Sequence, residues 1–173
     1  MPKNLLQWLF AMLAGALLAA VLAPAPSGAR EMVPFAGAYY PGTIVIKTRE
    51  RRLYFVLGQG YAIRYPVGVG RAGQQWTGVA YVDDMRVAPD WVPPPTMRRD
   101  PYSPAYVIPG GSPQNPMGAA ALTLTGGEYA IHGTNQPQSI GGFVSSGCIR
   151  MHNEDVVDLF ARVTVGTPVV VAR

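Results

Sequence analysis

The sequence has little cysteine, little histidine and little charge, and each shortage excludes a class of protein. Its 173 residues include one cysteine and two histidines, and charged residues make up 14% of the chain. A single cysteine cannot form a disulfide within the chain. One cysteine and two histidines, without clustered carboxylates, fall short of a usual zinc ligand set, and no Gly-rich phosphate loop is present. We therefore expect neither a metal nor another cofactor.

The charge balance is mildly basic and evenly distributed. Fourteen lysines and arginines stand against ten acidic residues, which gives a formal net charge of +4. The basic residues are spread along the chain and do not form a block. This balance permits attraction to an anionic surface, but it does not indicate nucleic acid as a partner.

The N-terminus has the pattern of an export signal. Lys3 precedes a long apolar run over residues 5–23, and small residues and prolines follow. We expect a signal peptide over residues 1–29 that is cut after Ala29, because a cut after Ala25 would leave a proline as the first mature residue. The alternative is an uncleaved anchor, since about 19 residues at about 1.5 Å each could span a membrane. Either way the rest of the chain is exported, and membrane contact is expected only with the anchor.

The remaining residues suit one domain built mainly of β-strands. We expect a linker over 30–40 and a single domain over 41–173, which is long enough for one core. Twenty glycines and 17 prolines accompany short apolar segments rich in Val, Ile, Tyr and Phe, a pattern typical of strands joined by turns. Strands are expected at 43–47, 53–57, 61–65, 67–69, 81–87, 121–125, 129–132, 163–165 and 169–172, with hairpin turns at 58–60 and 126–127.

One short helix is expected over residues 154–161. Asn153 is a suitable N-cap, and acidic residues follow in the first turn, where they complement the helix dipole. Val156 and Phe160 lie on one face at a spacing of four. We expect that face to pack on the sheet behind the loop that carries Cys148.

A long proline-rich stretch over residues 87–118 cannot be a regular central strand or helix. It contains Trp91 followed by a valine and three prolines. Loops of this length in small domains are usually functional or disordered. The aromatic content favours an ordered flap over a cleft, and the alternative is a structural wrap.

The lone Cys148 is the main candidate for chemistry. An unpaired thiol in an oxidising compartment is a liability unless its reactivity is used, so we interpret Cys148 as a nucleophile. A thiol must lose its proton to attack, and a nearby imidazole can take it. His132 precedes Cys148 across a Gly-rich loop that can turn back, and His152 is the competing base. An activated Cys148 should react well below the pH expected of a free thiol.

Two neighbours of Cys148 suit acyl chemistry. Gly147 lets the backbone approach a ligand closely, and successive N–H groups there could form an oxyanion hole. Arg150 can bind a carboxylate through two parallel hydrogen bonds. The roles of Cys148 and Arg150 have ordinary alternatives. A lone cysteine is often a small buried residue, and Arg150 can serve only to brace the loop.

The motifs around these residues resemble the YkuD-type L,D-transpeptidase catalytic domain family. The resemblance covers roughly residue 41 to the C-terminus, and its histidine and cysteine motifs are highly specific. The matching segments are His132-Gly133-Thr134-Asn135, Ser139-Ile140-Gly141 and Ser145-Ser146-Gly147-Cys148-Ile149-Arg150-Met151-His152-Asn153-Glu154-Asp155-Val156, with Tyr65-Pro66-Val67-Gly68-Val69-Gly70 and Asn115-Pro116-Met117-Gly118 upstream.

The resemblance implies a mainly β fold, a β-sandwich catalytic domain with one short helix after the catalytic cysteine. It implies that Cys148 is the nucleophile and that His132 donates and accepts the proton. The backbone carbonyl of Gly133 would orient the imidazole. The backbone N–H groups of Gly147 and Cys148 would form the oxyanion hole.

The resemblance also implies the substrate, the stem peptides of peptidoglycan in the periplasm or cell-wall space. Cys148 would form a thioester with the third residue of a tetrapeptide stem and release D-Ala. It would then pass the acyl group to an amine, either on a neighbouring stem to give a 3→3 cross-link or on a lipoprotein lysine. Arg150, Ser146 and Trp91 are the expected substrate-binding residues, and Ser146 stands where many members have histidine. The alternatives are a carboxypeptidase or endopeptidase acting on wall peptides, and a non-catalytic wall-binding module.

Overall fold

Short strands rich in β-branched residues make up most of the structure, a computed structural model that describes residues 30–93, 106–126 and 129–173. The expected signal segment and residues 94–105 of the expected flap lie outside the described residues. The elements are β1 (Glu31–Pro34), β2 (Ile44–Lys47), β3 (Arg52–Gly58), β4 (Tyr61–Pro66), β5 (Val69–Gly70), β6 (Gly78–Val87), β7 (Ala120–Leu124), β8 (Ala130–His132), the 3-10 turn η3 (Pro137–Ser139), β9 (Phe143–Ser145), β10 (Ile149–Arg150), α2 (Asn153–Phe160) and β11 (Pro168–Ala172).

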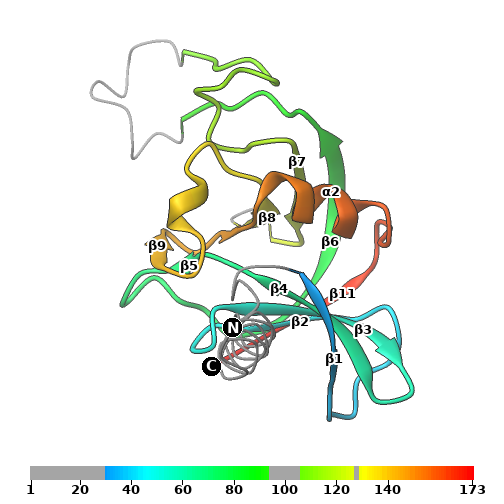
Figure 1. Ribbon diagram of the computed structural model, residues 1–173. Helices are drawn as coiled ribbons and strands as arrows, with labels where there is room; N and C mark the ends of the chain where they lie inside the picture. Colours follow the sequence, from blue (N-terminus) through cyan, green and yellow to red (C-terminus); the bar gives the residue numbers. More distant parts are fainter. Residues whose placement is uncertain (1–29, 94–105, 127–128) are drawn as a thin grey trace, which may run out of the picture.

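Nine of these strands form one sheet in the order β1-β4-β3-β2-β11-β6-β7-β8-β10, and β5 and β9 form a separate pair. The long strand β6 joins the two halves of the large sheet (Figure 1). Residues 78–81 of β6 pair with β11, and residues 82–87 pair with β7 after an irregularity between Val82 and Asp84. A bulge of this kind bends a strand, so β6 can serve both halves.

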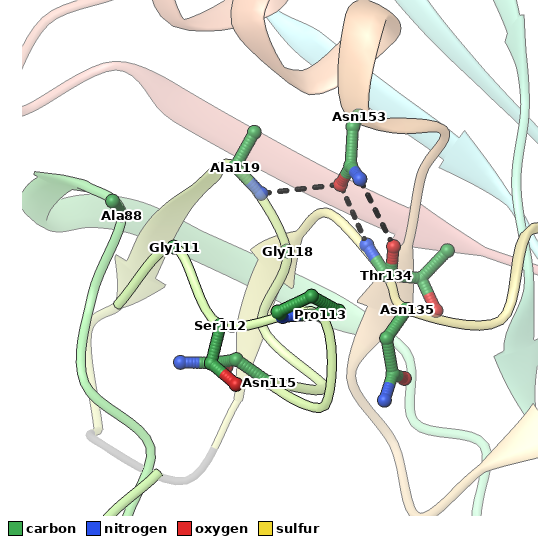
Figure 2. A pocket seen from close by; sticks show the side chains of 10 residues that line it. All are labelled: Ala88, Gly111, Ser112, Pro113, Asn115, Gly118, Ala119, Thr134, Asn135 and Asn153. Atoms are coloured by element: carbon green, nitrogen blue, oxygen red, sulfur yellow. Dashed lines mark hydrogen bonds between the residues drawn. The ribbon is translucent and has the colours of Figure 1, made fainter. Parts of the chain in front are cut away.

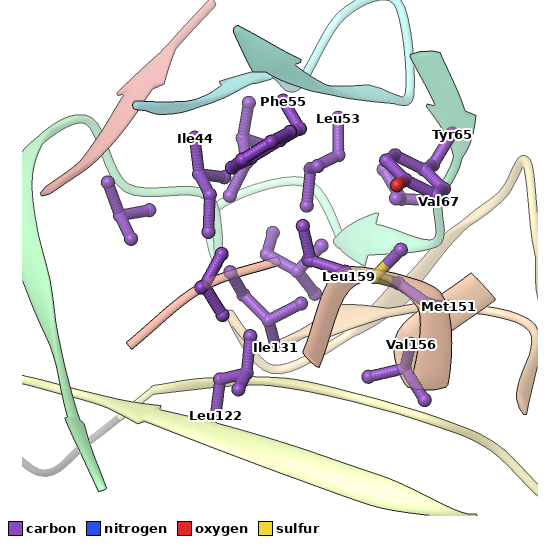
Figure 3. Close-up of a cluster of buried hydrophobic side chains, with 14 of the residues drawn as sticks. Ile44, Leu53, Phe55, Tyr65, Val67, Leu122, Ile131, Met151, Val156 and Leu159 are labelled. Atoms are coloured by element: carbon purple, nitrogen blue, oxygen red, sulfur yellow. The ribbon is translucent and has the colours of Figure 1, made fainter. Parts of the chain in front are cut away.

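Side chains from both halves of the sheet meet in one core (Figure 3). Ile44 and Leu53 come from the half that holds β2 and β3, whereas Leu122 and Ile131 come from β7 and β8, and all four are fully buried. Leu159 of α2 packs into the same cluster. The predicted mainly β fold with sandwich-like packing is therefore confirmed.

The segment expected as a linker over 30–40 is part of the fold. Residues 31–34 form β1 and pair antiparallel with β4. The ring of Phe35 is buried and stacks on Tyr54 with centroids 4.7 Å apart. The linker prediction missed this because the β1 segment is short and its residues are mostly exposed, so it has no strong apolar alternation.

Most other predicted strands are present within a residue or two. The hairpin at 58–60 is confirmed, with Gln59 and Gly60 both at positive φ (53° and 78°) between β3 and β4, as a tight hairpin turn requires. Residues 163–165 form a loop and turn, so the strand predicted there is wrong. The two-residue strand β10 and the short β9 were not predicted, because neither is long enough to show a period.

The helix α2 is the one α-helix among the described residues, and none of the described helices is long and apolar enough to cross a membrane. Asn153 is its first residue and His152 occupies the cap position without a side-chain cap bond, so the prediction of Asn153 as N-cap is wrong. Val156 and Leu159 are buried, and Phe160 packs partly buried against the same core. The helix contacts β7 and β8, which places it directly behind the site.

Candidate active site

A cavity of about 430 Å³ contains the predicted nucleophile and base. Five of the residues predicted from sequence line it, namely Cys148, His132, Arg150, Ser146 and Trp91. The other five lining residues are Arg71, Pro116, Met117, Val144 and Ser145. His152, the competing base, is not among them and instead caps α2, so the histidine in the cavity is His132.

Parallel pairing of β8 with β10 brings the predicted residues together. Ile149 pairs with Ile131 and Arg150 with His132. Paired residues in parallel strands project to the same face, and residues two apart in one strand share a face. Cys148, directly before β10, therefore faces the same side as His132 and Arg150.

The imidazole of His132 is held in one tautomer. Its Nδ1 lies 2.7 Å from the carbonyl oxygen of Gly133, and because a carbonyl only accepts, Nδ1 carries the proton. Nε2 is then the unprotonated nitrogen, which carries the lone pair that a general base requires. The residue that sequence reasoning assigned to orient the imidazole is thus in contact with it.

Burial keeps His132 neutral. The side chain is 5% exposed, and removal from water lowers its pKa to about 4, with the charge of Arg150 acting in the same direction. Hydrogen bonding to the carbonyls of Gly133 and Pro116 raises the pKa but does not offset burial. A neutral imidazole can accept the thiol proton over the whole physiological range.

Burial also raises the pKa of the Cys148 thiol. The backbone amides of Ala130 and of Cys148 itself, together with the charge of Arg150, act in the opposite direction but are weaker than burial. Burial therefore favours the protonated thiol and the neutral imidazole in this cavity. The raised thiol pKa contradicts the low-pH thiol reactivity expected from sequence.

The loop that carries Cys148 is closed by Ser145. The Ser145 hydroxyl donates to the carbonyl of Cys148 at 2.6 Å and accepts from the N–H of Gly147 at 3.1 Å. Gly147 has φ +128°, in the region that favours glycine. The Gly147 amide, expected as an oxyanion donor, thus already has an acceptor within the loop.

A second arginine, not predicted from sequence, lines the cavity. Arg71 follows β5 and donates from Nη2 to the Ser146 hydroxyl at 3.1 Å. Its backbone N–H bonds to the carbonyl of Ser145, which ties it to the Cys148 loop. With Arg150, two cationic side chains face the cavity, and such a pair suits an anionic ligand such as a carboxylate. The only sequence clue to Arg71 was its place directly after the matched segment that ends at Gly70.

The side chain of Asn153 connects the loop after His132 with the loop before β7 (Figure 2). Its Oδ1 accepts from the N–H of Thr134 at 3.0 Å and of Ala119 at 3.1 Å, and its Nδ2 donates to the carbonyl of Thr134 at 3.1 Å. These residues border a neighbouring pocket of about 270 Å³. Asn153 therefore organises the backbone next to His132, a role that its predicted cap position did not suggest.

The described part of the expected flap is anchored at Trp91. Its N–H and carbonyl each bond to Ile108 at 2.9 Å, which closes the base of the loop. The buried amide of Asn115 donates to the carbonyls of Pro89, Ile108 and Pro109. Trp91 reaches the cavity from this ordered base. The remaining flap residues, 94–105, are outside the described part of the chain.

Sequence comparisons identify the family of this chain. Residues 41–171 match the YkuD family, described as the L,D-transpeptidase catalytic domain. The chain is 42% identical over 137 residues to "Probable L,D-transpeptidase ErfK/SrfK" of Escherichia coli (strain K12), covering 73% of this chain and 42% of that protein. It is also 42% identical over 136 residues to "Probable L,D-transpeptidase YbiS" of the same strain, covering 73% and 43%. The chain thus spans less than half the length of these relatives.

A solved structure shares the fold. L,D-transpeptidase 3 from Mycobacterium tuberculosis, in complex with a faropenem-derived adduct, superposes with a TM-score of 0.59 at 18% identity. The match covers 76% of this chain and 60% of the other. At this level of identity the similarity supports the fold alone.

Proposed function

The chain belongs to the YkuD family of L,D-transpeptidase catalytic domains, and from this we propose that it is an exported peptidoglycan L,D-transpeptidase acting in the periplasm or cell-wall space. The observation that carries the proposal is the shared cavity of Cys148 and His132, with the Nδ1 of the imidazole fixed on Gly133. A binding module would not need a thiol beside a base in a fixed tautomer.

The first acyl transfer begins from the neutral thiol of Cys148 and the neutral imidazole of His132. The Sγ of Cys148 attacks the carbonyl carbon of the third stem residue as its proton passes to Nε2 of His132. The carbonyl oxygen becomes an oxyanion, and we assign the N–H of Cys148 as the group that donates a hydrogen bond to it. The intermediate then collapses, the bond to D-Ala breaks, and the imidazolium gives its proton to the leaving amine.

The second transfer reverses these roles. An acceptor amine attacks the thioester, and His132 takes a proton from it. The carbon–sulfur bond breaks, and the imidazolium returns the proton to the Cys148 thiolate. The arginines Arg71 and Arg150 suit the carboxylates of stem peptides. Trp91, on the anchored base of its loop, is positioned to restrict water, which would otherwise give the hydrolysis product.

Mass spectrometry of muropeptides tests the proposal. The purified protein is incubated with disaccharide-tetrapeptides beside a Cys148→Ala variant. We expect a dimer equal to two monomers less one D-Ala, carrying a 3→3 bond, in the wild type alone. Tripeptide alone would favour the carboxypeptidase, for which the same residues serve with water as acceptor. A peptide with a free lysine added as acceptor tests attachment of a lipoprotein. The absence of any Cys148-dependent product would overturn the catalytic assignment.

A further inference from the structure

Trp76 contacts the loop that carries Cys148 from outside the cavity. Its indole Nε1 donates to the carbonyl oxygen of Gly147 at 3.1 Å. Trp76 lines a separate pocket of about 160 Å³ with Tyr129 and Leu124 and is not among the residues that line the Cys148 cavity. The carbonyl of Gly147 therefore points away from the cavity.

The hydrogen bond to Trp76 also fixes the direction of the Cys148 N–H, because the Gly147 carbonyl and the Cys148 N–H belong to the same peptide. A trans peptide is planar, and its C=O and N–H point in opposite directions. Because the carbonyl of Gly147 points to Trp76, the N–H of Cys148 points the other way, toward the cavity. Cys148 itself lines the cavity, whereas Gly147 is not among its lining residues.

A second aromatic residue fixes the position of the indole. Trp76 and Tyr129 stack with ring centroids 4.9 Å apart and an interplanar angle of 7°. The Tyr129 ring in turn lies against Gly147, since a Cβ at Gly147 would come within 2.2 Å of the ring. The two rings leave the loop little freedom to shift at this residue.

From these contacts we propose that Trp76 is a positioning residue that holds the 147–148 peptide with the Cys148 N–H aimed at the developing oxyanion, and that Tyr129 holds Trp76 in place. This deepens the proposed function, because it names the device that presents the oxyanion donor. The Cys148 amide is the donor in question because the N–H of Gly147, the other donor predicted from sequence, is bonded to Ser145. A peptide free to rotate would offer its carbonyl to the substrate instead.

Two reactions of the same thiol separate this role from a merely structural one. Acylation by p-nitrophenyl acetate passes through a tetrahedral oxyanion, whereas alkylation by iodoacetamide displaces iodide at a saturated carbon and forms none. Both depend equally on the thiolate and on access to Cys148. The ratio of the two rates therefore reports on the oxyanion donor alone, and Cys148→Ala gives the background.

Trp76→Phe keeps an aromatic ring but removes the N–H. We expect its acylation rate to fall about 10-fold to 100-fold, while the alkylation rate stays within about twofold. Tyr129→Leu keeps the indole N–H but removes its stacking partner. We expect a smaller fall in its acylation rate, again with little change in its alkylation rate. Tyr129→Phe keeps the ring on Gly147 and is the matched control, with both rates unchanged.

An unchanged acylation rate in Trp76→Phe would overturn the inference, and so would an equal fall in both rates. Failure of the wild-type thiol to be acylated while it is alkylated would overturn it as well, because no oxyanion donor would then be operating. If Trp76→Phe does not fold, the Tyr129→Leu ratio decides between the same outcomes. The ester assay needs no muropeptide, so the proposed function can fail independently in the muropeptide assay.

Discussion

The side-chain oxygen of Asn153 accepts a hydrogen bond from the N–H of Thr134 at 3.0 Å, while the carbonyl at the other end of the same peptide, that of Gly133, faces Nδ1 of His132 at 2.7 Å. The two ends of a trans peptide point in opposite directions. Asn153 therefore sets the direction of the carbonyl that selects the tautomer of His132. A residue of α2 thus acts on this imidazole through one backbone peptide.

Asn153→Ala should lower turnover by about 100-fold, because a carbonyl that is free to tilt no longer holds Nε2 toward the thiol. We expect kcat to fall and KM to change little, since Asn153 does not line the Cys148 cavity. Steady-state kinetics on tetrapeptide muropeptides measures both constants. Asn135→Ala removes another asparagine of the same neighbouring pocket, one that donates to the carbonyl of Gln114, and serves as the control. Equal effects of the two variants would contradict the role of Asn153.

The two histidines should differ sharply in importance. His132→Gln removes the base in the cavity and should lower kcat by about 100-fold to 10,000-fold. His152→Gln changes a residue that caps α2 without a side-chain cap bond, so we expect less than about a threefold change. Muropeptide turnover measured on both variants gives the ranking, and a reversed ranking would mean that the wrong histidine has been assigned as base.

The sequence predicted the residues that carry strong local patterns. Short apolar segments rich in β-branched and aromatic residues gave β2, β3, β4 and β7, because such residues favour strands and the segments are bounded by turn residues. The pairs of glycines and polar residues at tight turns gave the β3–β4 hairpin. Cys148 was predicted because it is the one thiol of the chain. The two histidines left the base open, and the resemblance to the YkuD family favoured His132 over His152.

The rest depends on contacts that no spacing encodes. Trp76 and Arg71 reach the Cys148 loop from the segment after β5, and Asn153 reaches two loops from the start of α2. Trp76 and Asn153 bond backbone groups that lie far away in sequence. Arg71 bonds the hydroxyl of Ser146, which is also distant in sequence. β10 has two residues, which is too short for a period, although its parallel pairing with β8 assembles the site.

The charge of Arg150 acts on the pKa values of both His132 and Cys148 in the same direction. Its charge lowers the pKa of His132 and that of Cys148, so Arg150→Gln should raise both. The thiolate fraction then falls, and we expect the alkylation rate at pH 8 to drop several-fold. The pH dependence of iodoacetamide labelling measures the thiol pKa. Arg71→Gln removes the other cavity arginine, which bonds Ser146, and should leave the pH dependence of labelling unchanged. If the pH dependence is also unchanged in Arg150→Gln, the charge of Arg150 does not affect the thiol.

The hydroxyl of Tyr65 stabilises the fold by linking β4 to α2. The side chain is fully buried, and its hydroxyl donates to Oδ2 of Asp158 at 2.6 Å, where Arg162 also binds the carboxylate. Tyr65→Phe should lower the free energy of unfolding by about 1.5–3 kcal/mol, because a buried hydrogen bond to a charged group is lost. Tyr61→Phe, at a half-exposed position of the same strand, should cost less than about 0.5 kcal/mol. Urea unfolding of both variants measures the difference, and equal costs would count against the link.

Burial of neutral His132 should make the fold less stable in mild acid. In the unfolded chain the imidazole takes up a proton near its ordinary pKa of 6.5, whereas in the folded protein its pKa is lowered to about 4. Between these values the unfolded state binds more protons, so stability falls as pH falls from about 6.5 toward about 4 and this contribution levels off below that. At pH 4.5 the loss from this residue should be on the order of 2 kcal/mol relative to pH 7.

Comparison with a variant that cannot titrate isolates this contribution. His132→Gln keeps a polar side chain but has no proton to gain, so its unfolding free energy should fall less between pH 7 and pH 4.5 than that of the wild type. Urea unfolding at the two pH values gives both differences, and carboxylates with shifted pKa values, such as buried Asp155, are common to both proteins and cancel. His152→Gln should follow the wild type, because the remaining His132 still resists protonation. A wild type and His132→Gln that lose the same stability would show that the pKa of His132 is not lowered in the folded protein, and the argument that burial keeps this imidazole neutral would then fail.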